Sequence, residues 1–561
     1  MALTRLVRKP HRLPILLFLV LTLSLSASRA ESPNPPPYYA IRNARRVTVS
    51  GAVIEKGTIV VASGLIASVG PDAAIPPEAW VIEGEGLTVY PGLIDSLTNL
   101  GLPPAEEPAR PGGAGQHARA PVIRGPEDRP ATTTWENAAD SLKPDDKRLE
   151  MWRKAGFTSA VSSPEKGIFP GQAALINLAG ERASEMVVKT PVALRVNFAS
   201  PGGLWGFPGS LMGVLAYVKQ LFLDADQYSR AWEVYAANPR GLERPAYDRT
   251  LEPLRQARAQ NWPVLLPATR TQEIDRALRF ADELGARPLL YGAHQGYDAA
   301  DTLAAKKAPV LVSLKWPEKA KEGDPEAEEP LRELRLRDRA PSTPAALHKA
   351  GVKFAFYSDG ITSPQDILKN ARKAVEAGVP EEAAVRAFTL SAAENFGVAD
   401  RLGSLEPGKI ANLTVADGDL LAEKTKVKMV FIDGRKYEAR EPGRPTEPPA
   451  ANMSGRWNLT VNTPQGPEER TAELSMAEDG SLSGSLTGPR GTASISSGWV
   501  SGNKFSFTLT FTMGARTIEA TYSGTLEGYK ISGTVSAGPR TSDFTGTRPE
   551  TTGGGKENNH E

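Results

Sequence analysis

The sequence has few of the side chains, histidine and cysteine, that bind transition metals or titrate near neutral pH. The 561-residue chain has five histidines and no cysteine, which excludes disulfides and thiol catalysis. Neither His-x-His nor His-Glu-x-x-His spacing occurs in it. His294 follows the short apolar run 288–291 and Asp359 follows the run 354–357, and runs of this kind form buried strands. Imidazole titrates near neutral pH, and a carboxylate beside it would orient it or raise its pKa, so such a pair could transfer protons.

A third acidic residue, Asp95, ends the apolar run 89–95, where two apolar pairs flank a Pro-Gly. We expect one buried strand that opens into a loop at Asp95. The segment Pro-Gly-Leu-Ile-Asp at 91–95 resembles the first barrel strand of the amidohydrolase superfamily. The run Gly-Ser-Leu-Glu-Pro-Gly-Lys-Ile-Ala-Asn-Leu-Thr-Val at 403–415 is similar to the C-terminal strands of the same family and is the more specific match. The resemblance covers residues 39–437, most of the chain.

The resemblance implies a hydrolase of C–N bonds in which a metal lowers the pKa of bound water and polarises the scissile carbonyl. In the family, two histidines after the first strand bind that metal. Here those two positions hold Leu97 and Asn99. Leucine has no lone pair to give, and asparagine offers only a weak amide oxygen to an ion such as zinc.

The other ligand positions are partly kept. The fourth-strand segment has Arg195 where the family often has a carbamylated lysine, and the fifth has Pro267 where a histidine is expected. The sixth and eighth strands keep His294 and Asp359, which are our candidate catalytic residues. A catalytic zinc needs about three protein ligands, so we predict no metal-binding residues and no cofactor unless substitute ligands exist. His117 is the candidate for such a substitute metal ligand.

Two interpretations of His294 and Asp359 stay open. They are either a hydrogen-bonded remnant of the family's site, or a metal-free acid/base pair or ligand contact. Asp95, with no metal-binding histidines to orient, is expected to bond neighbouring backbone. His348 is expected on a helix, and His560 lies in the polar tail.

The elements that would position these residues alternate between strand and helix. Short apolar runs separated by helical stretches with apolar residues at a spacing of three to four indicate a parallel sheet covered by helices. The helical stretches include 212–237 and 274–284. Eight strand–helix units would form a (β/α)8 barrel, whose active site lies at the carboxyl ends of its strands.

The expected fold is multidomain, α/β plus all-β. It comprises an amidohydrolase-like (β/α)8 barrel with a composite β-sandwich and a C-terminal antiparallel β-barrel-like domain. The segments are a signal peptide (1–30), the N-terminal sandwich strands (39–92), the barrel (93–402), the C-terminal sandwich strands (403–437), a Pro-rich linker (438–453), the antiparallel β domain (454–548) and a disordered tail (549–561).

The β domain is predicted from alternating strands every 8–12 residues, which indicate a meander closed into a barrel or nearly so. Gly455-x-Trp457 at its start and Thr547-Arg548 at its end resemble the calycin pattern, in which an arginine covers a tryptophan at the barrel base.

Residues 1–30 read as a secretory signal peptide, because a basic segment precedes the apolar run 13–25 and small residues stand at a cleavage position. We therefore expect an exported protein, periplasmic or secreted. The alternative is an uncleaved membrane anchor, although the run is shorter than the roughly 20 residues of a spanning helix. A formal charge of +1 gives no nucleic-acid footprint. The expected partner is a small-molecule substrate or ligand.

Two classes of function follow. The first is a hydrolase of non-peptide C–N bonds, amide or cyclic amide, with a degenerate metal site. The second is a non-catalytic barrel that binds a small molecule or a protein partner. Polar groups converging on His294 and Asp359 would favour the enzyme, and an apolar or filled mouth would favour the binding protein.

Overall fold

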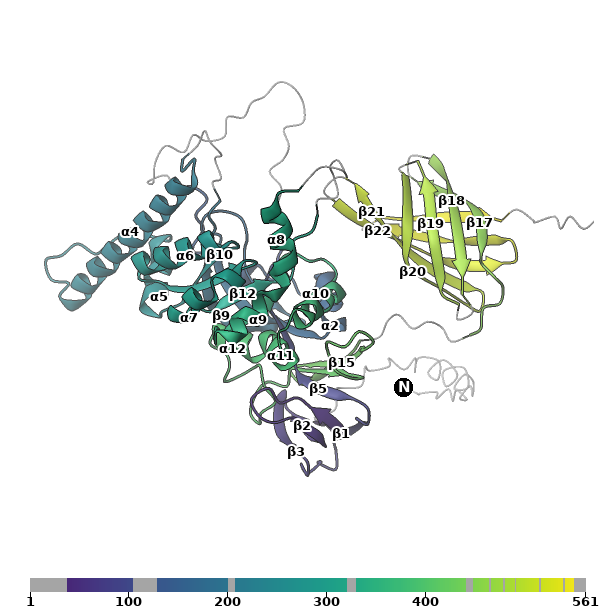
Figure 1. Ribbon diagram of the computed structural model, residues 1–561, viewed down its shortest axis with the longest axis horizontal. Helices are drawn as coiled ribbons and strands as arrows, with labels where there is room; N and C mark the ends of the chain where they lie inside the picture. The colour runs from purple at the N-terminus through teal and green to yellow at the C-terminus, as the bar shows by residue number, and fades with distance from the viewer. Residues whose placement is uncertain are drawn as a thin grey trace, which may run out of the picture. The chain divides into compact units, whose positions relative to one another are not determined.

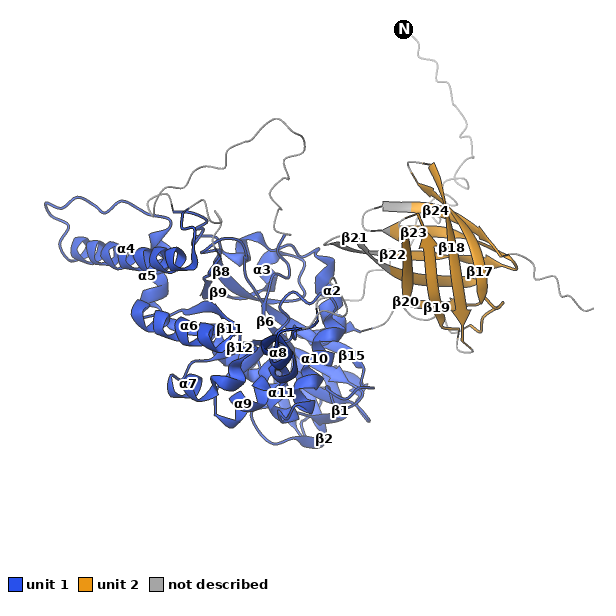
Figure 2. Ribbon diagram, turned by 45° about the horizontal axis from the view of Figure 1, so that its top comes forward, with its two compact units in different colours: residues 1–439 blue, residues 440–561 orange. Residues whose placement is uncertain are grey.

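The structure is a computed structural model, and it divides the chain into two units, residues 1–439 and 440–561 (Figure 2). It describes residues 38–103, 129–199, 207–319 and 329–439 of the first unit, and 447–463, 466–477, 480–489, 491–513, 516–537 and 540–548 of the second. The expected signal peptide, His117 and His560 lie outside these ranges. None of the helices within them is both long and apolar enough to cross a bilayer.

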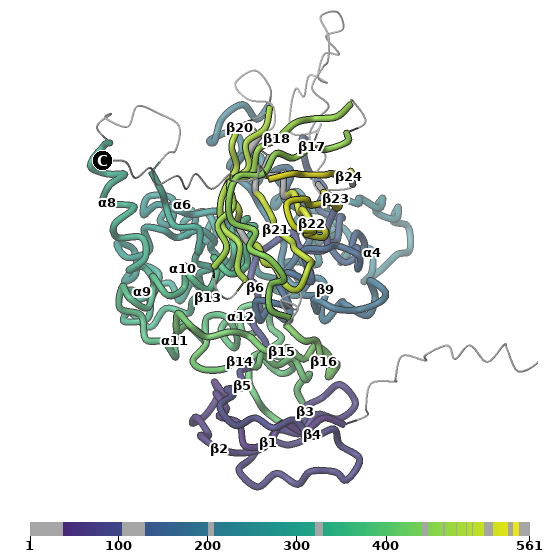
Figure 3. Tube along the Cα trace, turned by 90° about the vertical axis from the view of Figure 1, so that its right-hand side faces the viewer, coloured from purple at the N-terminus to yellow at the C-terminus, as the bar shows by residue number. Residues whose placement is uncertain are grey.

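The first sheet of unit 1 joins the two ends of that unit. Its order is β16-β15-β14-β5-β1-β2-β3, with β4 paired to β1. The C-terminal strand β14 pairs antiparallel with the N-terminal strand β5, which is the composite arrangement expected from the sequence. Figure 3 shows β1–β4 at one end of the unit. The strands are β1 (Tyr38–Arg46), β2 (Ile54–Ala62), β3 (Leu65–Gly70), β4 (Trp80–Glu83), β5 (Thr88–Pro91), β14 (Leu413–Ala416), β15 (Val427–Ile432) and β16 (Arg435–Glu438).

The second sheet is the barrel, an eight-stranded sheet in the order β13-β12-β11-β10-β9-β8-β7-β6. Its two edge strands meet where the backbone N–H of Ser358, just after β13, donates to the Asp95 carboxylate of β6. The strands are β6 (Leu93–Thr98), β7 (Phe157–Ser162), β8 (Gly171–Asn177), β9 (Val187–Arg195), β10 (Pro263–Ala268), β11 (Arg287–Gly292), β12 (Val310–Ser313) and β13 (Phe354–Tyr357).

One strand departs from the expected all-parallel sheet. β8 runs antiparallel to both β7 and β9, whereas the other pairs along the sheet are parallel. The connections 163–170 and 178–186 are too short for a parallel crossover, which needs a dozen or more residues. The seven residues of β8 are all buried. The sheet therefore departs from the expected (β/α)8 pattern by a hairpin in place of one strand–helix unit.

Helices lie around the barrel strands (Figure 1). In α6 the buried residues include Ile274, Ala277, Leu278, Ala281 and Leu284, the spacing read from the sequence. The predicted helix 212–237 is present as α4. The helices are α2 (Lys147–Lys154), α3 (Ala183–Met186), α4 (Leu211–Ala237), α5 (Leu251–Ala259), α6 (Thr271–Leu284), α7 (Ala300–Ala305), α8 (Leu331–Arg339), α9 (Thr343–Lys349), α10 (Pro364–Glu376), α11 (Glu381–Phe388) and α12 (Leu390–Asn395).

Unit 2 is a closed antiparallel barrel of β17–β24, as the alternating pattern predicts. Trp457 is fully buried, and the Arg548 guanidinium lies 5.2 Å from its ring centroid, which is the contact expected from the calycin-like pattern. The strands are β17 (Gly455–Thr463), β18 (Gly466–Met476), β19 (Leu482–Gly488), β20 (Gly491–Ser501), β21 (Lys504–Met513), β22 (Arg516–Glu527), β23 (Lys530–Ala537) and β24 (Arg540–Thr547).

Candidate active site at the carboxyl ends of the barrel strands

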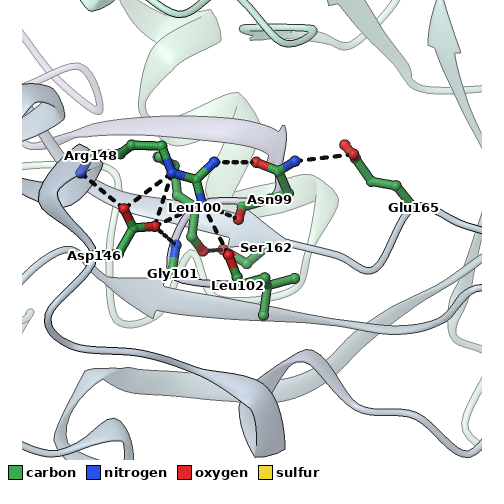
Figure 4. Close-up of polar contacts among 8 residues, drawn as sticks. All are labelled: Asn99, Leu100, Gly101, Leu102, Asp146, Arg148, Ser162 and Glu165. Atoms are coloured by element: carbon green, nitrogen blue, oxygen red, sulfur yellow. Dashed lines mark hydrogen bonds and ion pairs between the residues drawn. The ribbon is translucent and has the colours of Figure 1, made fainter. Parts of the chain in front are cut away.

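The carboxyl ends of β6, β7, β9, β11, β12 and β13, with the residues that directly follow them, form what we call the barrel mouth. On its first-strand side, Leu97 is buried and packs into the core inside the barrel. The Asn99 side chain is held at both ends (Figure 4). Its Oδ1 accepts a hydrogen bond from Arg148 Nη1 at 2.7 Å, and its Nδ2 donates to Glu165 Oε2 at 3.0 Å.

Arg148 is itself fixed by the start of α2. Its guanidinium donates to the Asp146 carboxylate and to the backbone oxygens of Asn99 and Leu102. Asp146 is the N-cap of α2 and also accepts from the backbone N–H of Gly101 at 2.9 Å. Burial acts to raise the pKa of Asp146, but the hydrogen bonds and charge of Arg148 bring it below its ordinary value. A protein cation thus occupies this side of the mouth.

Asp95 links the first and last barrel strands. It is 1% exposed. Its Oδ1 accepts from the Ser358 backbone N–H at 3.0 Å, and its Oδ2 accepts from Trp152 Nε1 at 3.2 Å. Burial raises the pKa of Asp95 to about 6, although these hydrogen bonds favour the charged form and limit the rise. The expected bond to neighbouring backbone is present, with an indole as a second donor.

His294 and Asp359 lie after β11 and β13, and β13 neighbours the first strand β6. His294 follows β11 and is 9% exposed, and its Nε2 forms no hydrogen bond with any residue that the structure describes. Burial lowers the pKa of His294, while the Asp359 charge and the backbone of Ser313 and Lys315 oppose that effect. Asp359 follows β13 in a left-handed conformation, and its Oδ2 accepts from Ser313 Oγ at 2.7 Å. The two predicted residues are therefore close enough to interact, with no hydrogen bond joining them.

Further polar groups gather around Tyr291, which interacts electrostatically with Asp359. Tyr291 of β11 donates from its hydroxyl to Asn197 Oδ1 at 2.8 Å and stacks edge-on against Tyr357 of β13. The Arg195 guanidinium, at the end of β9, lies 5.4 Å from the Tyr291 ring centroid. Burial raises the pKa of Tyr291, with Arg195 opposing the shift and Asp359 adding to it. Arg195 is the one member of this group that the sequence singled out besides His294 and Asp359.

The residues present do not fit the metal site of the family. No group of three or more histidine, cysteine, aspartate or glutamate side chains in the described ranges could hold a metal ion. At the second histidine position, the Asn99 oxygen already accepts from a cation. Pro267 lies within β10 and offers no ligand. His348 is exposed on α9, as expected for a surface helix, and is no substitute.

The comparisons with known proteins agree with the fold. The sequence model of the Amidohydrolase family matches residues 286–436. Amidohydrolase tasK of Hapsidospora irregularis is 22% identical over 415 residues, which cover 67% of this chain and 39% of that protein. The imidazolonepropionase of Mesorhizobium japonicum is 26% identical over 415 residues, which cover 68% of this chain and 92% of that protein. The chain thus spans well under half of one relative and nearly all of the other.

A solved structure gives the same answer. The crystal structure of an amidohydrolase from Thermotoga maritima matches with a TM-score of 0.59 and 26% identity, covering 72% of this chain and all of that one. By family match, by relatives and by fold, unit 1 of this chain is amidohydrolase-like.

Proposed function

We propose that the chain is an exported amidohydrolase-like protein that hydrolyses a non-peptide C–N bond, in an amide or a cyclic amide, without the metal site of its family. The observation that carries the proposal is the placement of His294 near the Asp359 carboxylate, which Ser313 holds by a hydrogen bond, at the carboxyl ends of the barrel strands. Active sites of such barrels are built at this face. A small-molecule substrate agrees with the relatives, one of which is named imidazolonepropionase.

His294 is the general base in this proposal. Its lowered pKa keeps the imidazole neutral at pH 7, and its buried Nε2 has no protein partner. A neutral imidazole can accept a proton from water as the water oxygen attacks the carbonyl carbon, and then give that proton to the nitrogen as the C–N bond breaks. Asp359 lies near enough to stabilise the imidazolium that forms between these steps, because its charge favours the protonated ring.

A second candidate is a barrel that binds a small molecule without turning it over. The observation that favours it is the first-strand side of the mouth, where Asn99 is held by Arg148 and Glu165. Fully paired polar groups of this kind are typical of structural networks. In this reading, His294 and Asp359 are ligand contacts.

The deciding experiment is a hydrolysis assay of the purified protein on simple amides and cyclic amides, with and without a chelator, followed by mass spectrometry of the products. We expect turnover that survives the chelator and is lost in His294→Ala. His348→Ala, which removes an exposed histidine from α9, is the matched control. Ligand-induced thermal stabilisation without product would support the binding barrel instead, and turnover that needs added metal would contradict the mechanism.

Export is the part of the proposal that rests on sequence alone, since residues 1–30 have the pattern of a signal peptide. The test is mass spectrometry of the protein recovered from the medium or the periplasm after bacterial expression. A mature chain beginning near Glu31 is expected. A full-length chain retained with the membrane fraction would favour an uncleaved anchor.

A further inference from the structure

Arg195 is a nearly buried cation with weak protein partners. Its side chain is 12% exposed. Its Nε donates to Asn197 Oδ1 and its Nη1 to the backbone oxygen of Pro164, both at 3.3 Å. Among the described residues the one carboxylate within 4 Å belongs to Glu165, at 3.9 Å. A guanidinium paired with a carboxylate usually forms two bonds of about 2.7–2.9 Å, so Arg195 lacks the partner that its geometry suits.

The surroundings of Arg195 fix it in place rather than neutralise it. Asn197 donates from its Nδ2 to the backbone oxygens of Glu165 and Gly167, at 2.7 and 3.0 Å, which orients its Oδ1 toward Arg195 and the Tyr291 hydroxyl. The Tyr291 ring lies against the guanidinium. Such preorganisation lowers the entropy lost when a ligand is bound.

Glu165 stands between Arg195 and the first-strand side of the mouth. Its side chain is 43% exposed, and its carboxylate accepts one hydrogen bond, from Asn99. Figure 4 shows it at the end of the Arg148–Asn99 chain of bonds. A half-exposed carboxylate held by one amide can turn into solvent at little cost, because exposed ion pairs contribute little.

We propose that Arg195 recognises a carboxylate on the small molecule that enters the barrel mouth, and that the Glu165 carboxylate gives way to it. Asn99 Nδ2, released by Glu165, donates to the same incoming group. The inference rests on the proposed function and narrows its substrate class to amides and cyclic amides that carry a carboxylate. Arginine suits this role because its planar fork matches a carboxylate in two bonds.

Matched pairs of small molecules test the proposal by isothermal titration calorimetry and thermal shift. 5-Oxoproline is compared with 2-pyrrolidinone, the same ring without the carboxylate, and N-acetylglycine with N-methylacetamide. We expect the carboxylates to bind and the neutral partners not to. Arg195→Met should weaken carboxylate binding about 10- to 100-fold, the size of hydrogen bonds to charged groups. Arg195→Lys, which keeps the charge without the fork, should fall between.

Two further variants sharpen the result. Glu165→Gln should strengthen carboxylate binding several-fold, because the competing charge is removed. Arg182→Met is the matched control, since Arg182 is an exposed cation that pairs with Glu185 three residues along the chain, and the variant should bind as the unaltered protein does. Equal binding of the neutral partners, unchanged affinity in Arg195→Met, or no binding by either carboxylate would each overturn the proposal.

The outcome also separates this inference from the proposed hydrolysis. If carboxylates bind through Arg195 but are not cleaved, the proposed hydrolysis is wrong and the recognition role of Arg195 is kept. Carboxylate-bearing amides cleaved with the same kcat/KM by Arg195→Met and by the unaltered protein would overturn the recognition role and leave the hydrolase.

Discussion

The two sides of the barrel mouth satisfy their polar groups differently. On the first-strand side, both polar atoms of the Asn99 side chain are bonded, and Arg148 and Asp146 bond each other and nearby backbone. After β11, His294 Nε2 is buried and has no partner among the described residues. Buried polar groups are nearly always paired in native proteins. His294 Nε2 is thus a position where a bound water or a ligand atom would complete the hydrogen bonding, and we propose that the substrate lies there.

The contacts of Asn99 also explain why this residue does not act as a metal ligand in place of the family's second histidine. At the second histidine position, Arg148 presents a positive charge 2.7 Å from the Asn99 oxygen. A divalent cation there would meet that charge at short range, where like charges repel strongly. The first-strand side is thus held by a protein cation, and the proposed proton transfer is assigned to His294.

The largest effect we expect comes from removing the unpaired imidazole. His294→Ala should lower the hydrolysis rate by about 100-fold or more, the usual contribution of a general base, and should change unfolding little. The measurement is the initial rate on whichever amide the panel identifies, beside a urea unfolding curve. His348→Ala should match the unaltered protein. If the variant unfolded at a lower urea concentration but kept its hydrolysis rate, His294 would have a structural role and not a catalytic one.

The second substitution tests whether the hydrogen-bonded group of Asn99, Arg148 and Asp146 is structural. Asp146→Ala removes the N-cap of α2, the acceptor for Gly101 N–H and the partner of Arg148, so we expect the free energy of unfolding to fall by about 3 kcal/mol. Urea unfolding followed by tryptophan fluorescence would measure it. Asp140→Ala, in the short 3-10 turn 138–141, is the control for losing a nearby carboxylate. Equal stability of the two variants would show that this hydrogen-bonded group is not structural.

The raised pKa of Asp95, which links the first and last barrel strands, predicts that the free energy of unfolding depends on pH. Its folded-state pKa of about 6 lies above the ordinary 3.8, so the folded protein holds this proton more tightly than the unfolded chain. The resulting stability is present below about pH 4 and is lost as pH rises to about 6, a change of about 3 kcal/mol at 1.36 kcal/mol per pKa unit. Unfolding free energies from pH 4 to 7, compared with Asp95→Asn, would reveal it. Parallel curves for the two proteins would contradict the raised pKa.

Much of the fold could be predicted because local patterns encode it. The alternation of β17–β24 and the apolar spacing of α6 each require only neighbouring residues to be read. The antiparallel β8 was missed because its seven residues are buried on both faces and show no period. Only the short connections on either side, 163–170 and 178–186, exclude a crossover.

The candidate site divides in the same way. The places of His294 and Asp359 at the ends of two barrel strands could be predicted because each follows a short apolar run, whereas their proposed roles come from the resemblance to the amidohydrolase superfamily. Arg148 and Glu165 could not be predicted, because they lie 49 and 66 residues from Asn99 and reach it only through the folded chain. No local signal indicates which of many surface cations and carboxylates will meet at the mouth.

The smallest effect we expect is that of a chelator. Treating the purified protein with EDTA should leave its melting temperature unchanged, because a ligand that binds only the folded state stabilises it and its removal would lower that temperature. Added zinc should likewise leave the melting temperature unchanged. The Arg148 guanidinium already bonds the Asn99 oxygen, and His294 with Asp359 supply fewer than three ligands. A clear loss of stability in EDTA, abolished in His294→Ala, would mean that a ligand outside the described ranges completes a metal site. His117 would be the first residue to replace, and the two sides of the mouth would then form one centre.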